Sequence, residues 1–253
     1  MKILINVFAI LIFVSSLVAG KMYWNHQLDK QFESKPTRVS AAETEKDMQT
    51  ETKNLPESIA KKLENAKKKG NPVKLVIVGS APEKNVKTWG TLLKDKLEDT
   101  YGTDLINVEL YEYKQMNTLQ FVKSKTYEEI TKAKPDILLF EPFLLNDNGV
   151  VGINNTIDNL QIIMKHIESE NKDLVTIFQP SAPVYQAQNY PNDVKALETF
   201  AKENGYEFVN HWSAWPDYNE EDILKYLSDE NGQPNEEGEK VWFKFLSEYF
   251  TNS

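Results

Sequence analysis

The chain has 253 residues, of which 40% are hydrophobic and 11% aromatic, which is enough for a sizeable core. Its net charge of −9 argues against a nucleic-acid partner, because binding to phosphates requires clustered Lys and Arg. The absence of cysteine excludes disulfides, thiol catalysis and thiolate metal sites.

The N-terminus begins with an uncharged apolar run, residues 3–20, between two lysines. Two interpretations remain open. A cleaved signal peptide would end at small residues such as Ala19 and Gly20. An uncleaved anchor needs about 17–25 apolar residues, and the aromatic pair at 23–24 suits a membrane interface. In both cases residues 1–24 place the rest of the chain on the outer side of the cytoplasmic membrane. Membrane contact is expected through this segment only.

The following segment, residues 25–55, is polar and charged. Such a composition buries too little apolar surface to order the backbone, so it predicts a flexible stalk. Apolar spacing then indicates a helix over residues 56–69, with Gly70 as its stop. We expect the folded domain to span residues 56–253.

Strand and helix patterns alternate from residue 73 onward, which predicts a three-layer α/β sandwich around a five-stranded, mainly parallel sheet. Ligands of such sheets bind beyond the carboxyl ends of the strands. The strands are expected at 73–80, 106–113, 135–143, 174–180 and 206–212, and the helices at 88–102, 126–134, 155–171, 192–205 and 236–250.

The first strand ends in a Gly-Ser pair and carries neither a dinucleotide fingerprint nor a nucleotide loop. No cofactor is expected, and the scattered acidic residues with only three histidines give no metal site. Ser80 just beyond this strand is either a turn or cap residue or a nucleophile near the amides of the next turn. Spacing alone leaves both interpretations open.

The order of the motifs resembles that of the SGNH (GDSL-type) hydrolases over residues 73–253. Ser80 matches the serine of the first block, although Gly79 stands where that block usually has aspartate. Asn146 and Asp147 match the Asn-Asp of the third block. The resemblance implies a flavodoxin-like fold in which Ser80 attacks an ester while its own amide and Asn146 stabilise the oxyanion.

Other blocks depart from the family pattern. Leu144 replaces the glycine of the third block, and the glycine that follows the second strand in the family is missing. The last block, Asp-x-x-His before Pro-Asn, has Glu230 and Gln233 instead. Glutamine cannot take up a proton near neutral pH, so this position cannot supply the base that a serine nucleophile needs.

His211 is the candidate for a relocated base, because it ends the predicted fifth strand at the active edge of the sheet. A packed or hydrogen-bonded loop histidine is the alternative. His26 lies in the stalk and His166 on a solvated helix, so neither competes. Acidic residues that would orient the imidazole are Asp229, Glu230 and Asp217.

Four further residues are candidates for the wall of the site. Glu141 ends the third strand and Asp147 follows Asn146. Trp212 and Trp215 are aromatic residues of the kind that stack on sugars, although a loop that covers the core uses the same residues. Ser181 is a second serine near the end of the fourth strand.

These patterns predict an extracytoplasmic serine ester hydrolase or acyl transferase, with an acylated cell-surface glycan as a candidate substrate. The alternative is a catalytically silent binding module that kept the fold. A structural surface protein is the third possibility.

Overall fold

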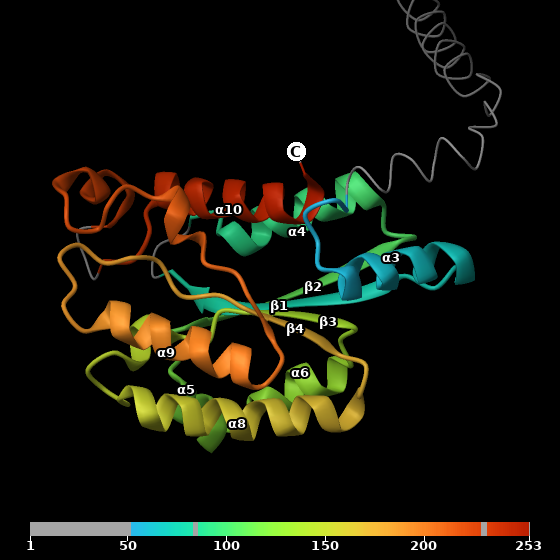
Figure 1. Ribbon diagram of the computed structural model, residues 1–253, viewed down its shortest axis with the longest axis horizontal. Helices are drawn as coiled ribbons and strands as arrows, with labels where there is room; N and C mark the ends of the chain where they lie inside the picture. The colour runs from blue at the N-terminus through green and yellow to red at the C-terminus, as the bar shows by residue number, and fades with distance from the viewer. Residues whose placement is uncertain (1–51, 83–85, 229–231, 253) are drawn as a thin grey trace, which may run out of the picture. The chain divides into compact units, whose positions relative to one another are not determined.

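The computed structural model describes residues 52–82, 86–228 and 232–252 as an α/β domain (Figure 1). The predicted N-terminal segment 1–24 and most of the predicted stalk lie outside the described residues. Within the described part of the chain, no helix is both long and apolar enough to cross a membrane.

A five-stranded sheet forms the centre of the domain, and all of its strand pairs are parallel. The strand order β2-β1-β3-β4-β5 is that of flavodoxin-like folds, in which the crevice lies where the order reverses, between β1 and β3. The predicted fold class is therefore confirmed. The strands are β1 (Val73–Ala81), β2 (Ile106–Lys114), β3 (Ile137–Phe140), β4 (Val175–Phe178) and β5 (Glu207–Phe208).

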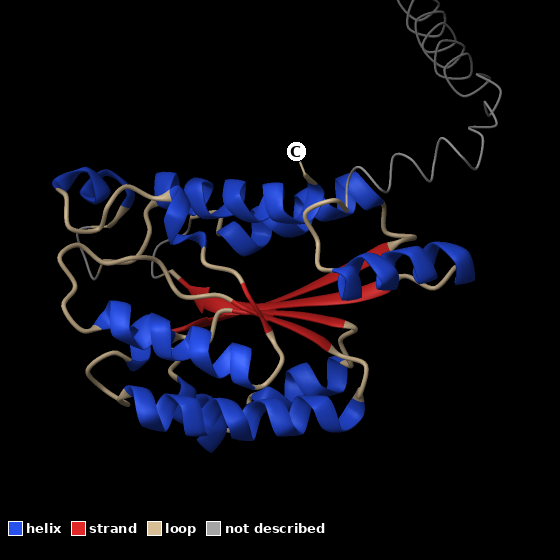
Figure 2. Cartoon of the chain, viewed as in Figure 1, coloured by secondary structure: helices blue, strands red, loops and turns tan. Residues whose placement is uncertain are grey.

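Helices cover both faces of the sheet, as Figure 2 shows. Alternate residues of β1 enter two separate cores, because successive side chains of a strand point to opposite faces. Leu75 and Ile77 pack under one helical layer, whereas Val76 and Val78 pack under the other. The first layer holds α3 (Glu57–Lys69), α4 (Trp89–Tyr101) and α10 (Glu236–Thr251); the second holds α5 (Thr118–Lys123), α6 (Tyr127–Ala133), α8 (Ile153–Glu170) and α9 (Tyr190–Glu203).

Short helical elements follow the strands at the edge where ligands are expected. They are α7 (Leu144–Asp147) and the 3₁₀ helices η1 (His211–Ala214) and η2 (Glu221–Tyr226). The sequence pattern did not predict these, nor α5, because elements of four to six residues show no helical period. The predicted fifth strand over 206–212 is wrong at its end, since β5 pairs with β4 at only two positions. His211 therefore begins a 3₁₀ helix, and the side chain of Asn210 caps that helix by accepting from the amide of Trp212 at 3.1 Å.

Residues that precede the predicted boundary at residue 56 also pack on the domain. Leu55 is only 8% exposed and belongs to the core under α3, α4 and α10. The neighbouring Asn54 donates from Nδ2 to the carbonyl of Glu248 at 3.0 Å. The packed domain therefore includes residues 52–55, which a composition-based boundary assigned to the stalk.

Candidate active site

A small pocket of about 30 Å³ opens at the carboxyl ends of β1, β3 and β4, between these strands and the start of α10. This is the edge at which parallel sheets bind ligands. The lining comes from five stretches of the chain, within 80–82, 89, 141–146, 181–182 and 233–242, and includes two tryptophans. The lining residues are Ser80, Ala81, Pro82, Trp89, Glu141, Leu145, Asn146, Ser181, Ala182, Gln233, Pro234, Glu239 and Trp242.

Glu141 joins two serines across the ends of three strands. Its Oε2 accepts from the backbone N–H of Ser80 at 2.7 Å, and its Oε1 accepts from the hydroxyl of Ser181. The hydroxyl of Ser181 in turn accepts from the amide of Leu145 at 3.2 Å. Glu141 is fully buried, and this burial raises the pKa of its carboxyl group, although the hydrogen bonds from both serines and from the Phe143 backbone oppose the rise.

Gly79 leaves the space that this carboxylate occupies. A Cβ atom on residue 79 would lie 3.0 Å from Cζ2 of Trp89 and 3.4 Å from Oε2 of Glu141. A side chain at residue 79 would therefore press on the ring of Trp89. Glu141, directly after β3, already places a carboxylate beside Ser80.

Asn146 reaches the pocket from α7, the turn that follows β3. This turn begins at Phe143, whose φ of 59° lies in the left-handed region, a conformation that costs a bulky residue about 1–3 kcal/mol. The Phe143 carbonyl then accepts from the amide of Asn146 at 2.9 Å. The side-chain Nδ2 of Asn146 donates to the carbonyl of Met116 at 2.7 Å. This nitrogen carries two hydrogens, and the Met116 carbonyl takes only one of them. The other hydrogen has no partner among the described residues, so it is available to a ligand.

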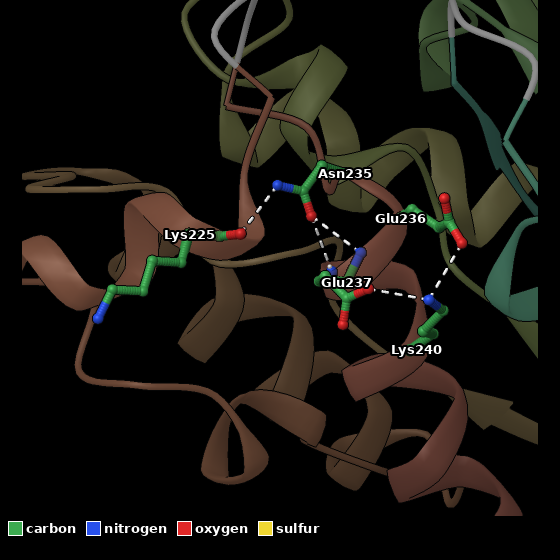
Figure 3. A network of polar contacts seen from close by, with 6 residues as sticks. Lys225, Asn235, Glu236, Glu237 and Lys240 are labelled. Atoms are coloured by element: carbon green, nitrogen blue, oxygen red, sulfur yellow. Dashed lines mark hydrogen bonds and ion pairs between the residues drawn. The ribbon is translucent and has the colours of Figure 1, made fainter.

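The Pro-Asn-x-x-Gly block forms the N-terminus of α10 (Figure 3). The Oδ1 of Asn235 caps the helix by accepting from the amides of Glu237 and Gly238 at 3.0 and 3.1 Å, and its Nδ2 donates to the carbonyl of Lys225 at 2.9 Å. This anchor holds Gln233 at the pocket, in the place where the resemblance leads one to expect a histidine.

Glu239 is a second buried carboxyl group of the pocket, with 2% of its surface exposed. Its Oε2 accepts from the backbone N–H of Trp89 at 2.7 Å. Burial, with smaller contributions from the charges of Glu112 and Glu141, raises the pKa of Glu239 to about 8. The described residues contain no group of three or more His, Asp or Glu side chains placed to hold a metal ion.

His211 does not take the position proposed for it as a relocated base. Its Nδ1 accepts from the indole N–H of Trp215 at 2.9 Å, so its Nε2 carries the hydrogen and donates to the carbonyl of Pro180 at 3.0 Å. The ring stacks on Trp242, and complete burial lowers the pKa of His211 to about 3. The imidazole is thus a neutral core group with no lone pair left for Ser80, and we do not assign the base role to it.

Three other candidates lie away from the pocket lining. Asp147 is buried and accepts from the amide and hydroxyl of Thr118 and from the hydroxyl of Thr156, so it fixes α5, α7 and α8 to one another. Trp212 donates from Nε1 to the carbonyl of Ser181 at 2.8 Å, and Trp215 packs in the core. All three make contacts within the protein, and none belongs to the described pocket lining.

Asp229 and Glu230, two of the three predicted orienting residues, lie outside the described residues. The third, Asp217, accepts from the backbone and side-chain N–H groups of Asn219. The Ser80 amide, expected to face an oxyanion, instead donates to Glu141 because a buried carboxylate competes strongly for such donors. Sequence reasoning missed Glu239 altogether, and it treated Ser181 only as a second serine. The helical spacing could have indicated Glu239, because this residue lies one turn after Asn235 at the start of α10.

Comparison with known proteins gives a consistent picture of the fold. No family model and no curated protein matches the sequence. Among solved structures, a putative lipolytic protein of the G-D-S-L family from Desulfitobacterium hafniense superposes with a TM-score of 0.57 at 18% identity, covering 70% of this chain and 99% of that one.

Two carbohydrate-directed enzymes are similar as well. An acetylxylan esterase from Geobacillus stearothermophilus gives a TM-score of 0.54 at 13% identity, covering 70% of this chain and 94% of the other. A carbohydrate esterase of family 3 from Talaromyces cellulolyticus gives 0.57 at 12% identity, with coverage of 69% and 94%. Together with the strand order and the pocket at the strand ends, these likenesses show that the chain has the α/β fold of the SGNH (GDSL-type) hydrolases.

Proposed function

We propose that the domain hydrolyses or transfers a short acyl ester, with Ser80 as the nucleophile. The proposal rests on the arrangement of the pocket. Ser80 and Asn146 line the same small pocket, and the Glu141 carboxylate accepts from the backbone N–H of Ser80. The second amide hydrogen of Asn146 would donate to the oxyanion as the carbonyl becomes tetrahedral. The small volume of the pocket favours a short acyl group over a long fatty chain.

The substrate that we propose is an O-acylated glycan at the cell surface. Two of the similar structures are described as an acetylxylan esterase and a carbohydrate esterase, and this supports a sugar ester. The described residues of the pocket lining include no Lys or Arg, so none of them favours a phosphate or carboxylate near the scissile bond. A neutral sugar acetate fits these properties.

The nucleophile is tested by hydrolysis of 4-nitrophenyl acetate and 4-nitrophenyl octanoate by the full chain. We expect the acetate to be the better substrate and Ser80→Ala to abolish the rate, since no other group replaces a nucleophile. Ser213→Ala is the matched control, because Ser213 is exposed and lies outside the pocket lining, and it should keep the wild-type rate. A Ser80→Ala variant with undiminished activity would rule out the nucleophile.

A second candidate function is a catalytically silent binding module, which two observations favour. Gln233 stands where the resemblance leads one to expect the base. The Ser80 amide already donates its hydrogen bond to Glu141, so it is not available to an oxyanion. In that case the wild type would match buffer in the same assay, whereas Gln233→His would gain activity.

We also propose that residues 1–24 hold the domain on the outer side of the cytoplasmic membrane. The support is the apolar run at 3–20, which follows a lysine and is long enough for either a signal peptide or an anchor. Fractionation should place the protein in the membrane or outside the cell, and mass spectrometry of its N-terminus would distinguish anchor from cleaved signal. A soluble cytoplasmic pool of the full-length chain would contradict this location.

A further inference from the structure

We propose that Glu141 is the general base that activates Ser80, in place of a histidine; this inference rests on the proposed function. Within the described lining of the pocket, only Glu141 and Glu239 can take up a proton. Glu239 accepts from the backbone N–H of Trp89, whereas Glu141 accepts from the backbone N–H of Ser80 itself. His211, the remaining candidate, has both ring nitrogens engaged elsewhere.

The geometry around Glu141 is that of an oriented base. Its Oε2 lies 2.7 Å from the backbone nitrogen of Ser80. The Ser80 side chain lines the same pocket and is close enough to lower the pKa of this carboxyl group. Ser181 holds the opposite oxygen and is itself fixed by the amide of Leu145. Such a chain, from nucleophile to base to orienting group, is the recurring arrangement in nucleophilic catalysis. In this arrangement Ser181 is a positioning residue.

The surroundings make this carboxylate a stronger base than one in water. Burial raises the pKa of Glu141, and the charged and titratable groups that face it are Glu239 from α10 and Tyr190 from α9. Within the described pocket lining no cation offsets the charge of Glu141. A general base works best when its pKa approaches the working pH, and these surroundings move Glu141 in that direction.

The proton transfers balance through a complete ester hydrolysis. Glu141 takes the proton of the Ser80 hydroxyl as Oγ bonds to the acyl carbon, and then gives that proton to the leaving alcohol as the ester C–O bond breaks. Water next attacks the acyl-enzyme while Glu141 takes one of its protons. That proton returns to Ser80 Oγ as the acid is released.

The test compares Glu141→Gln, Glu141→Asp and Glu112→Gln in the full chain. Glutamine keeps the size of the side chain and an oxygen that can accept from the Ser80 amide, but it cannot take up a proton. We expect Glu141→Gln to lower kcat/KM for 4-nitrophenyl acetate by about 10²–10⁴-fold, which is the usual contribution of a general base. Glu141→Asp keeps the carboxylate one methylene shorter and should lose less.

Glu112→Gln is the matched control, because Glu112 is a half-buried carboxyl with a raised pKa on β2 and lies outside the pocket lining. It should stay within about threefold of the wild type. The pH profile gives a further readout: kcat/KM of the wild type should fall as the pH drops through the raised pKa of Glu141, and this limb should vanish in Glu141→Gln. A residue that only supports the structure would lower the rate without removing the limb.

Labelling of Ser80 with a fluorophosphonate separates this inference from the proposed function, because it reports nucleophile activation without turnover. Labelling that depends on Glu141 in a protein that hydrolyses no ester would uphold the base and overturn the esterase. Conversely, Glu141→Gln with wild-type labelling and turnover, beside an inactive Ser80→Ala, would overturn the base and leave the esterase standing. A wild type that neither labels nor hydrolyses would overturn both. Thermal melts verify that each variant is folded.

Discussion

Gly238→Ala is expected to cost the domain most of its stability. A Cβ atom at this position would lie 2.2 Å from the backbone carbonyl oxygen of Tyr226, and 3.0 Å from Pro234 and from the ring of Trp215. The oxygen cannot move away freely, because it accepts from the amide of Asn235 at 3.0 Å. Alanine is favoured over glycine within a helix by about 1 kcal/mol, but we expect the clash to cost about 4 kcal/mol or more.

The matched control for this substitution is Gly90→Ala, which also lies in a helix. A Cβ atom there would meet the ends of the Leu110 and Glu112 side chains at 2.8 and 3.0 Å, and side-chain ends can rotate where backbone cannot. Urea denaturation should show a much larger loss of unfolding free energy for Gly238→Ala than for Gly90→Ala. Similar losses would mean that the contact between α10 and η2 is looser than the structure shows.

Glu239→Gln is expected to stabilise the domain above neutral pH. The folded-state pKa of Glu239 is raised from an ordinary value of 4.5 to about 8, chiefly by burial. Between these two values the unfolded chain releases a proton that the folded chain retains, so stability falls as the pH rises through this window. The difference between these two pKa values corresponds to a loss of at most about 5 kcal/mol in the free energy of unfolding.

Glutamine at this position stays neutral at every pH and keeps an oxygen for the backbone N–H of Trp89. At pH 5 the wild type and the variant should therefore differ little in their unfolding free energies. At pH 9 we expect the variant to be more stable by several kcal/mol, measured by urea denaturation at pH 5, 7 and 9. Parallel stability curves for the two proteins would show that Glu239 is not buried as described.

The sequence was sufficient to predict the sheet, because long apolar strands and periodic helices carry their signal locally. Val73–Ala81 and Glu236–Thr251 match their expected ranges closely. The short segments at the carboxyl edge carry no comparable signal. The length of β5 depends on pairing with β4, and the start of η1 depends on a cap from Asn210, so His211 was placed on the wrong kind of element.

The site was predictable in part for the same reason. Ser80 lies at the carboxyl end of β1 and Asn146 follows β3, so their common position at one edge was foreseeable from the strand order. The partners of Glu141 and His211 were not, because each depends on a contact across the fold: Ser181 lies 40 residues from Glu141, and Pro180 lies 31 residues from His211. A local sequence pattern carries no information about contacts between residues that are so far apart in the chain.

The absence of a side chain at Gly79 also constrains how this sequence can change. A lone change to aspartate, as in the Gly-Asp-Ser block, would press on Trp89 and place a second buried carboxylate beside Glu141. Residues 79, 89 and 141 therefore form one coupled set, in which the effect of each substitution depends on the other two. A change to aspartate at residue 79 is therefore expected to be tolerated better when residue 89 or 141 changes with it than when it occurs alone.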